Sequence, residues 1–149
     1  MKRVILVLIT VCLSMSAFPQ KGNFGMGMIL GNPTAFSIKW WTGNNSAIDA
    51  SLGYHYGNMN HLHLNTDLLL HLWSIKKEED IIKIYFGPGA GMGFISDLSI
   101  SVRAPVGAGL YLHDLPLELF AELVPLLQII GPGDTRFMMD GYIGARWYF

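Results

Sequence analysis

The chain has 149 residues, a formal net charge of -1, a charged fraction of 14% and a hydrophobic fraction of 51%. Its length fits a single domain, and the near-neutral charge gives no electrostatic basis for binding nucleic acid. Soluble domains carry about 25% charged residues, so the chain is unusually apolar for a water-soluble protein. After the first segment, no apolar run approaches the about 20 residues of a membrane-spanning helix. Alternation of polar and apolar residues along strands would explain both observations.

The first residues have the pattern of a secretory signal peptide. Two basic residues precede an apolar run from Val4 to Leu13, and small and polar residues follow it. This pattern predicts a signal peptide over residues 1–20, cleaved between positions 16 and 20, and a mature domain over residues 21–149. The only cysteine, Cys12, lies inside the signal, so we expect the mature domain to lack disulfides. Lipidation of this cysteine is less favoured, because the apolar segment before it would be very short.

Clusters of Gly, Asn, Asp and Pro divide the mature sequence into eight segments, with the spacing of an all-β meander. In chain order, the first four predicted strands are residues 22–30, 34–41, 47–56 and 61–73. The charged sequence KKEED then predicts a solvated turn. The fifth strand starts at Ile81 and runs into the sequence GPGAGMG, and the last three are residues 99–112, 117–126 and a terminal strand that ends at Phe149.

Each predicted strand has one apolar and one polar face. In the fourth strand, leucines at positions 62, 64, 68, 70 and 72 share one face, and polar residues at 61, 63, 65, 67 and 71 share the other. Successive side chains of a strand point to opposite faces, and in every strand with charges these fall on a single face. The charged residues of the polar face are Lys39, Asp49, Asp67, Lys83, Arg103, Glu118, Glu122, Asp140 and Arg146.

Three observations place this polar face inside a closed sheet. First, the face is rich in glycine, such as Gly107 and Gly109; glycine weakens a solvent-facing strand, but in a narrow lumen it makes room for large side chains. Second, an export signal is predicted. Third, aromatic residues gather at strand ends, where membrane barrels have interfacial girdles: Trp40, Trp41, Tyr54, Tyr56, Trp73, Trp147 and Phe149. The sequence therefore predicts an eight-stranded antiparallel up-and-down transmembrane β-barrel.

The terminal sequence DGYIGARWYF resembles the C-terminal signal by which the assembly machinery recognises bacterial outer-membrane barrels. The residues that match are Ile143, Ala145, Trp147 and Phe149. The mature chain is similar to the small OmpA/OmpX-like barrels. It is also similar to short barrel families of unknown function with a G-x-P-T-x-x-S-x-K-x-W opening hairpin, matched by Gly31, Pro33, Thr34, Ser37, Lys39 and Trp41.

This resemblance implies a monomer in the bacterial outer membrane, in contact with its lipids and, during biogenesis, with the barrel-assembly machinery. Both termini would be periplasmic, together with the turns TGNNS, KKEED and HDLP. The loops after the first and third strands are short, unlike those of OmpX-like proteins, so adhesion through long loops is not expected. The sequences GAGMGFISDLS and QIIGPGDTR are expected to be the sizeable external loops. The favoured interpretation of their apolar residues is that they extend the strands into the outer leaflet. The alternative is an apolar patch rimmed by charge that contacts a partner or lipid, formed by Phe94, Ile95, Asp97, Ile129, Ile130, Asp134 and Arg136.

An eight-stranded barrel is just wide enough for side chains to fill it, so no open pore is expected. Four basic and five acidic residues of the polar face nearly cancel, and buried charges must pair. We therefore predict a salt-bridge network that plugs the lumen, with Glu118 opposite Arg146. A catalytic role for these residues is less favoured.

The histidines of the polar face are the remaining candidates for chemistry. Across the turn GNMN, His55 falls opposite His61 or His63, and three imidazoles there could bind zinc or copper. Neutral, hydrogen-bonded histidines are the favoured interpretation, so neither a metal nor a cofactor is expected. No nucleophile stands beside a base, which favours a non-enzymatic structural or surface-interaction role. The alternatives are a lipid-modifying outer-membrane enzyme and a soluble, lipocalin-like ligand-binding barrel.

Overall fold

The computed structural model describes residues 22–31, 34–55, 61–94, 98–131 and 135–149, and the predicted signal peptide lies outside them. Every element of these ranges is a strand, and none of their residues forms a helix long and apolar enough to cross a bilayer. In chain order the strands are β1 (Phe24–Gly31), β2 (Thr34–Trp41), β3 (Ser46–His55), β4 (His61–Lys77), β5 (Asp80–Phe86), β6 (Gly89–Phe94), β7 (Ser99–Arg103), β8 (Val106–Tyr111), β9 (Leu117–Ile130) and β10 (Arg136–Tyr148).

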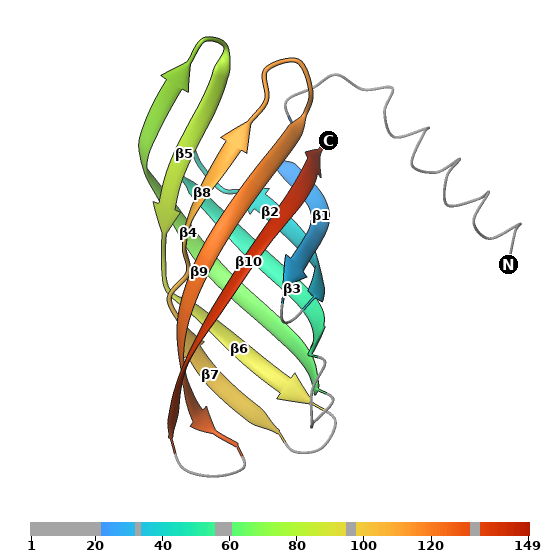
Figure 1. The fold of residues 1–149 in the computed structure, drawn as a ribbon, viewed down its shortest axis with the longest axis vertical. Helices are drawn as coiled ribbons and strands as arrows, with labels where there is room; N and C mark the ends of the chain where they lie inside the picture. The colour runs from blue at the N-terminus through green and yellow to red at the C-terminus, as the bar shows by residue number, and fades with distance from the viewer. Residues whose placement is uncertain (1–21, 32–33, 56–60, 95–97, 132–134) are drawn as a thin grey trace, which may run out of the picture.

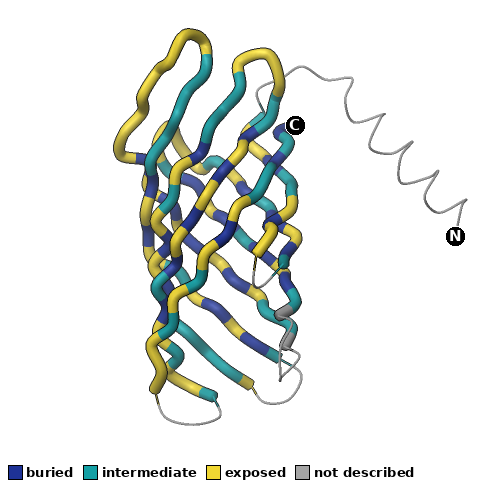
Figure 2. Tube along the Cα trace, in the orientation of Figure 1, coloured by how far each residue is buried: buried dark blue, intermediate teal, exposed yellow. Residues whose placement is uncertain are grey.

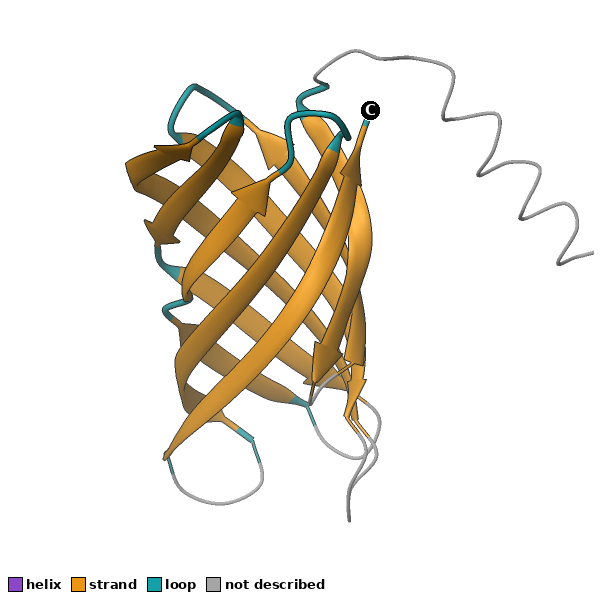
Figure 3. Ribbon diagram, turned by 45° about the horizontal axis from the view of Figure 1, so that its top comes forward, coloured by secondary structure: helices purple, strands orange, loops and turns teal. Residues whose placement is uncertain are grey.

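The ten strands form one antiparallel sheet that closes on itself as a β-barrel (Figures 1 and 3). From β1 to β4, each strand pairs with the next. Beyond β4 the sheet continues through β5 and β8, and also through β6 and β7, to β9. The terminal strand β10 pairs with β9 on one side and with β1 on the other. Because both sides of β10 are paired, the first and last strands leave no open edge between them.

Two predicted strands are each divided in two, which is why ten strands occur where eight were expected. Gly87 and Pro88 separate β5 from β6, and Ala104 and Pro105 separate β7 from β8. Proline has no N–H to donate and interrupts the ladder. The two interruptions lie side by side, since the Gly87 N–H donates to the Pro105 carbonyl at 3.1 Å.

Each divided pair occupies the place of one predicted strand. Residues 70–77 of β4 pair with β5, and residues 62–67 pair with β6. In the same way β9 pairs with β8 through residues 118–123 and with β7 through residues 126–130. The interruptions therefore bend two strands without removing them from the closed circuit.

Two strands extend beyond their predicted ends. β4 ends at Lys77 instead of Trp73, and β9 ends at Ile130 instead of Leu126. The predicted turn KKEED is therefore reduced to two residues, of which Glu78 has a left-handed φ of 58°. A register shift between His71 and Trp73 interrupts the alternation of β4. The β4–β5 hairpin projects beyond the neighbouring strands in Figure 1.

Parts of both sequences expected to form sizeable external loops are strand, so the expected length of these loops was wrong. Gly89–Phe94 is β6, and the last residues before Gly131 belong to β9. The glycines of β6 alternate with larger residues at the period of a strand, and this period outweighs their loop propensity. Phe94, Ile129, Ile130 and Arg136 accordingly lie on strands, whereas Ile95, Asp97 and Asp134 lie outside the described residues.

The two ends of the barrel differ in what they carry. The C-terminus, the β4–β5 turn and the β8–β9 turn lie at one end, which we call the C-terminal end (Figure 1). The last residues of β6 and β9 and the first residues of β7 and β10 lie at the opposite end. The Phe149 N–H donates to the Phe24 carbonyl at 2.9 Å, which holds the last residue against β1.

Candidate functional site

Burial alternates along the strands, and the buried face is the polar one (Figure 2). Seven of the nine charged residues predicted to face inward are buried: Lys39, Asp49, Asp67, Arg103, Glu118, Glu122 and Arg146. Large apolar side chains occupy the outer surface, among them Met28, Leu30, Phe36, Leu52, Leu72, Leu119, Leu123, Phe137, Met139 and Ile143. The barrel thus has the reverse of the distribution in a water-soluble domain, where charged residues are almost never fully buried.

The buried charges meet across the interior of the barrel. Lys39 on β2 lies 2.9 Å from Glu118 on β9, although these strands are not neighbours. Arg146 on β10 forms an ion pair with Asp49 on β3, which is equally remote in the sheet. Only side chains that point into the lumen can make such contacts, so a polar cluster lies in the interior.

Glu118 is the centre of this cluster. Its carboxylate accepts hydrogen bonds from Lys39 Nζ at 2.9 Å and from Arg146 Nη1 at 3.5 Å. It also accepts from two phenols, Tyr111 at 2.8 Å and Tyr148 at 2.6 Å. The predicted position of Glu118 opposite Arg146 agrees with the register of β9 and β10. Four donors around one carboxylate replace the water that this wholly buried charge has lost.

Arg146 spans the lumen from the other side. In addition to its contacts with Asp49 and Glu118, its Nε donates to Ser37 Oγ at 2.8 Å. The guanidinium also lies over the ring of Phe120, 3.7 Å from its centroid. A planar guanidinium offers five donors in a fixed fork, so one side chain ties β2, β3 and β9 to β10.

Lys39 lies among aromatic rings. Its Nζ is 3.0 Å from the Tyr111 hydroxyl and 3.2 Å from His71 Nε2, and it lies 4.8 Å from the centroid of Tyr85. His71 itself packs between Trp41 and Tyr85, with centroid distances of 4.3 and 4.9 Å. These rings supply the π faces that attract a desolvated ammonium group.

A separate ion pair lies farther from the C-terminal end. Arg103 Nε on β7 is 2.9 Å from Asp67 Oδ1 on β4, and its Nη2 donates to the Tyr142 hydroxyl at 2.9 Å. Gly89 of β6 lies between the two strands, as the register partner of both charged residues. A side chain at this glycine would collide with the Asp67 carboxylate, so the absence of a Cβ is what allows the pair to form.

Two of the predicted inward charges are less buried than the other seven. Lys83 is only half-buried, and its Nζ lies 4.2 Å from the centroid of the Trp41 ring at the C-terminal end. Asp140 is also of intermediate burial. The structure therefore buries seven of the predicted residues, in two groups, and leaves these two partly exposed.

The histidine candidates are only partly described. Register pairs His55 with His61, as one of the two predicted alternatives, and pairs His63 with Gly53. The side chains of His55 and His61 lie outside the described residues. His71 belongs to the lumen cluster, where it contacts Lys39.

The predicted network contained only charged residues and omitted the aromatic members of the cluster. Trp41 was expected in an interfacial girdle, but it packs against His71 inside the barrel, whereas its neighbour Trp40 is 59% exposed. Adjacent residues on a strand must face opposite sides, so only one of the two can reach the outside. Tyr85 and Tyr148 share the parity of charged residues in their strands, and that parity was the available signal.

The interior glycines make room for the cluster, as their position on the polar face suggested. A Cβ on Gly109 would lie 2.7 Å from Glu118 Oε1, and a Cβ on Gly107 would lie 2.7 Å from Glu122 Cγ. The ring of Phe120 likewise occupies the space beside Gly144. Larger residues at these positions would displace the very side chains that pair across the lumen.

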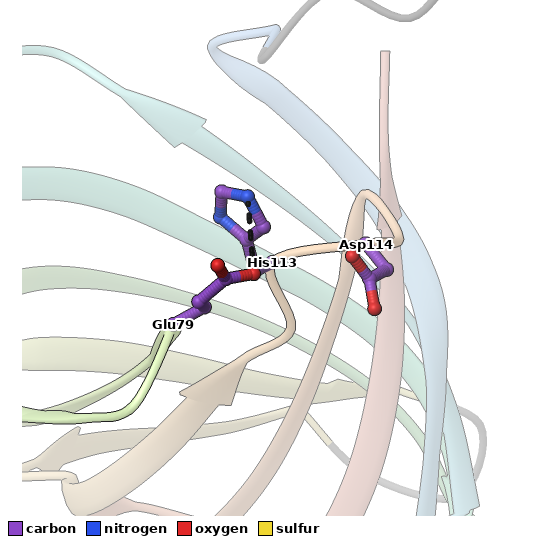
Figure 4. Close-up of side chains that lie close together, drawn as sticks. All are labelled: Glu79, His113 and Asp114. Carbon is purple, nitrogen blue, oxygen red and sulfur yellow. Dashed lines mark ion pairs between the residues drawn. The ribbon is translucent and has the colours of Figure 1, made fainter.

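A cavity of about 440 Å³ opens at the C-terminal end, above the cluster. Trp41, Lys83, Tyr111 and Tyr148 line its inner part, and turn residues form its rim. On that rim Glu79, His113 and Asp114 lie close together, on the β4–β5 and β8–β9 turns (Figure 4). His113 was assigned only to a turn by the sequence, and nothing in its local pattern indicated the approach of Glu79.

Comparison with known proteins gives one informative result. No protein-family model matches the sequence, and no curated protein matches it. Among solved structures, the N-terminal β-barrel domain of OprF from Pseudomonas aeruginosa is similar, with a TM-score of 0.53 and 14% identity over 86% of this chain and 98% of that domain. At this identity the similarity shows the fold alone, a β-barrel. The narrower resemblance to short barrel families of unknown function is not confirmed.

Proposed function

We propose that this chain is an integral outer-membrane β-barrel protein with a structural or surface-interaction role and no open pore. It would cross the bilayer eight times, with β5–β6 and β7–β8 each counted as one crossing. The observation that carries the proposal is the reversed distribution of side chains: Leu123, Phe137 and Ile143 are 63%, 65% and 61% exposed, whereas Lys39, Glu118 and Arg146 are 0% exposed. Hydrocarbon is the solvent in which that arrangement is stable.

The backbone supports the same conclusion. In a bilayer every N–H and C=O must find an internal partner, so only helices and closed barrels can cross it. Pairing of β10 with both β1 and β9 removes the open edge of the sheet. The exposed indoles of Trp40 and Trp73, near the C-terminal end, are where an interfacial girdle would anchor the barrel.

The filled lumen argues for a plugged barrel. The cluster centred on Glu118 connects β2, β3, β9 and β10 across the interior, and its members pack against aromatic rings. An ion could pass only by breaking these contacts, which would leave buried charges unpaired at high cost. We therefore propose that the network is structural and that the barrel does not conduct.

The proposed location is the bacterial outer membrane, reached through a cleaved signal peptide, with the C-terminal end toward the periplasm. The residues proposed as the assembly signal are Ile143, Ala145, Trp147 and Phe149, which lie at the end of the strand that closes the barrel. The lipids of this membrane and the barrel-assembly machinery are the partners that follow, and a monomer is the proposed state.

The two competing functions gain no comparable support. A lipocalin-like barrel would hold an apolar ligand in an apolar lumen, but this interior is charged and filled. A lipid-modifying enzyme would need an activated nucleophile near the lipid face. Ser37 does contact Asp49, but its hydroxyl is wholly buried in the lumen and also accepts from Arg146. We therefore propose a non-enzymatic role.

The experiment that tests the proposal is heat-modifiable migration of the chain extracted from membranes. An unboiled sample should migrate differently from a boiled one, because a closed barrel resists the detergent until it is heated. The variant Leu123→Arg should lose about 2–4 kcal/mol of stability in lipid if this position faces hydrocarbon. The matched variant Leu115→Arg, in the β8–β9 turn, should be nearly neutral.

Two results would contradict the membrane assignment. One is a chain that is fully soluble without detergent and migrates identically before and after boiling. The other is a Leu123→Arg variant as stable as the parent, since an exposed apolar residue on a water-soluble barrel tolerates a charge.

A further inference from the structure

Two turns at the C-terminal end bring three metal-binding residue types together. Glu79 lies in the β4–β5 turn, and His113 and Asp114 lie in the β8–β9 turn (Figure 4). The turns are neighbours because β5 pairs with β8, with Ile81 opposite Tyr111. One ligand atom from each of the three side chains lies within 4.8 Å of the others.

The donor set is that of a borderline-soft divalent cation. An imidazole nitrogen and two carboxylate oxygens are all ligands that Zn²⁺ takes in proteins. Four tetrahedral bonds of about 2.0–2.2 Å place neighbouring ligand atoms about 3.4 Å apart. His113 Nε2 and Glu79 Oε2 are 3.6 Å apart, which is close to the separation that a shared ion requires.

The backbone around the three ligands is already held in place. Asp80 Oδ1 accepts a hydrogen bond from the His113 backbone N–H at 3.0 Å. This contact joins the two turns without using any of the three ligand side chains. Because all three of those side chains are exposed, they can rotate by the small amount that coordination needs, while the Asp80 contact keeps their backbones together.

We propose that Glu79, His113 and Asp114 bind one Zn²⁺ ion, with the fourth position open to water. The ion would clamp the two turns at the rim of the cavity of about 440 Å³, which all three residues line. Without a cation, the carboxylates of Glu79 and Asp114 lie beside the imidazole of His113. A third carboxylate, that of Asp80, accepts from the His113 backbone. This inference goes beyond the proposed function and is independent of the side of the membrane that this end faces.

Zinc titration by calorimetry tests the proposal on the full folded chain, prepared without a polyhistidine tag. The substitution Cys12→Ser in every sample removes the only thiol. We expect one ion per chain, and at least a tenfold loss of affinity in His113→Ala and in Glu79→Gln. Glu78→Gln is the matched control, since it removes the same charge from the same turn and should leave the affinity unchanged.

Cobalt provides a second readout, since Co²⁺ replaces Zn²⁺ and absorbs strongly in the visible range when it is tetrahedral. The parent and Glu78→Gln should show this absorption, and His113→Ala should not.

Absence of zinc binding by the parent would overturn the proposal, as would equal affinity in His113→Ala. Loss of binding in His63→Ala with retention in His113→Ala would also overturn it and assign the ion to the His55, His61 and His63 set. Unchanged heat-modifiable migration shows that each variant has folded.

Discussion

The two halves of the barrel interior hold the strands together in different ways. Toward the C-terminal end, one connected cluster of charged and aromatic side chains joins strands that are far apart in the sheet, through Lys39, Glu118 and Arg146. In the opposite half, described contacts include a short one between neighbouring strands, from Asn65 Nδ2 to Ser51 Oγ at 3.3 Å. Arg103 also pairs with Asp67 and donates to Tyr142, and each of these contacts crosses one intervening strand.

This difference indicates which half of the closed barrel should contribute more to its stability. Side-chain contacts between neighbouring strands restrain the same two strands that backbone hydrogen bonds already join. Contacts across the lumen add a restraint that the ladder lacks, because they fix the distance between opposite walls. The half toward the C-terminal end should therefore be the more sensitive to the loss of a single side chain.

The largest effect is expected for Glu118→Ala. This substitution leaves Lys39 and Arg146 short of a partner and deprives two tyrosines of their acceptor. Breaking a buried ion pair by removing one partner costs about 3–5 kcal/mol. Urea unfolding of the detergent-folded protein, followed by gel migration, measures the loss.

The control for Glu118→Ala is Glu79→Ala, measured with a chelator present. It removes the same side chain from an exposed turn, where an ion pair contributes little. Equal stabilities of the two variants would show that the lumen cluster does not hold the barrel together, and the contrast between the two halves would disappear.

A smaller loss is expected for Arg103→Met in the opposite half. Methionine keeps the length of the side chain but removes the ion pair with Asp67 and the donor to Tyr142. Breaking this buried ion pair costs toward the lower end of about 3–5 kcal/mol, because one carboxylate loses its partner. Glu118→Ala leaves two cations and two tyrosines short of a partner, so it should cost more. The same urea measurement ranks the two, and a larger loss for Arg103→Met would reverse the assignment of the more important half.

The sequence predicted the faces of the strands well, because the direction of a side chain is a local property. Period-two alternation identified which face of β10 is apolar, and burial follows it from Phe137 to Tyr148. The span of β2 was also correct. Where alternation is interrupted, as at the irregular register near His71 in β4, the prediction of strand ends failed.

Partners across the lumen could not be predicted in the same way. Which inward residue of β2 meets which residue of β9 depends on the tilt and stagger of the strands, and both are properties of the closed sheet. Only pairs on adjacent strands, such as Glu118 and Arg146, followed from the turn between them. The divisions at Pro88 and Pro105 did have a local signal, since proline in a paired strand interrupts the ladder.

The smallest effect is expected for Gly89→Ala, which tests the ion pair of Arg103 with Asp67 across β6 in the half opposite the C-terminal end. Gly89→Ala would drive a Cβ into the Asp67 carboxylate and separate it from Arg103. Overpacking of this kind costs about 1–3 kcal/mol.

The matched variant is Gly141→Ala on the outer face, where the nearest side-chain atom, on Leu123, would be 3.4 Å from the new Cβ. That substitution should be neutral or stabilise by about 0.4–1 kcal/mol, because alanine restricts the unfolded chain. Stabilities measured in the Arg103→Met background separate the two causes: Gly89→Ala should cost less there, since the ion pair is already lost, and an undiminished cost would mean that the glycine serves the backbone and not the pair.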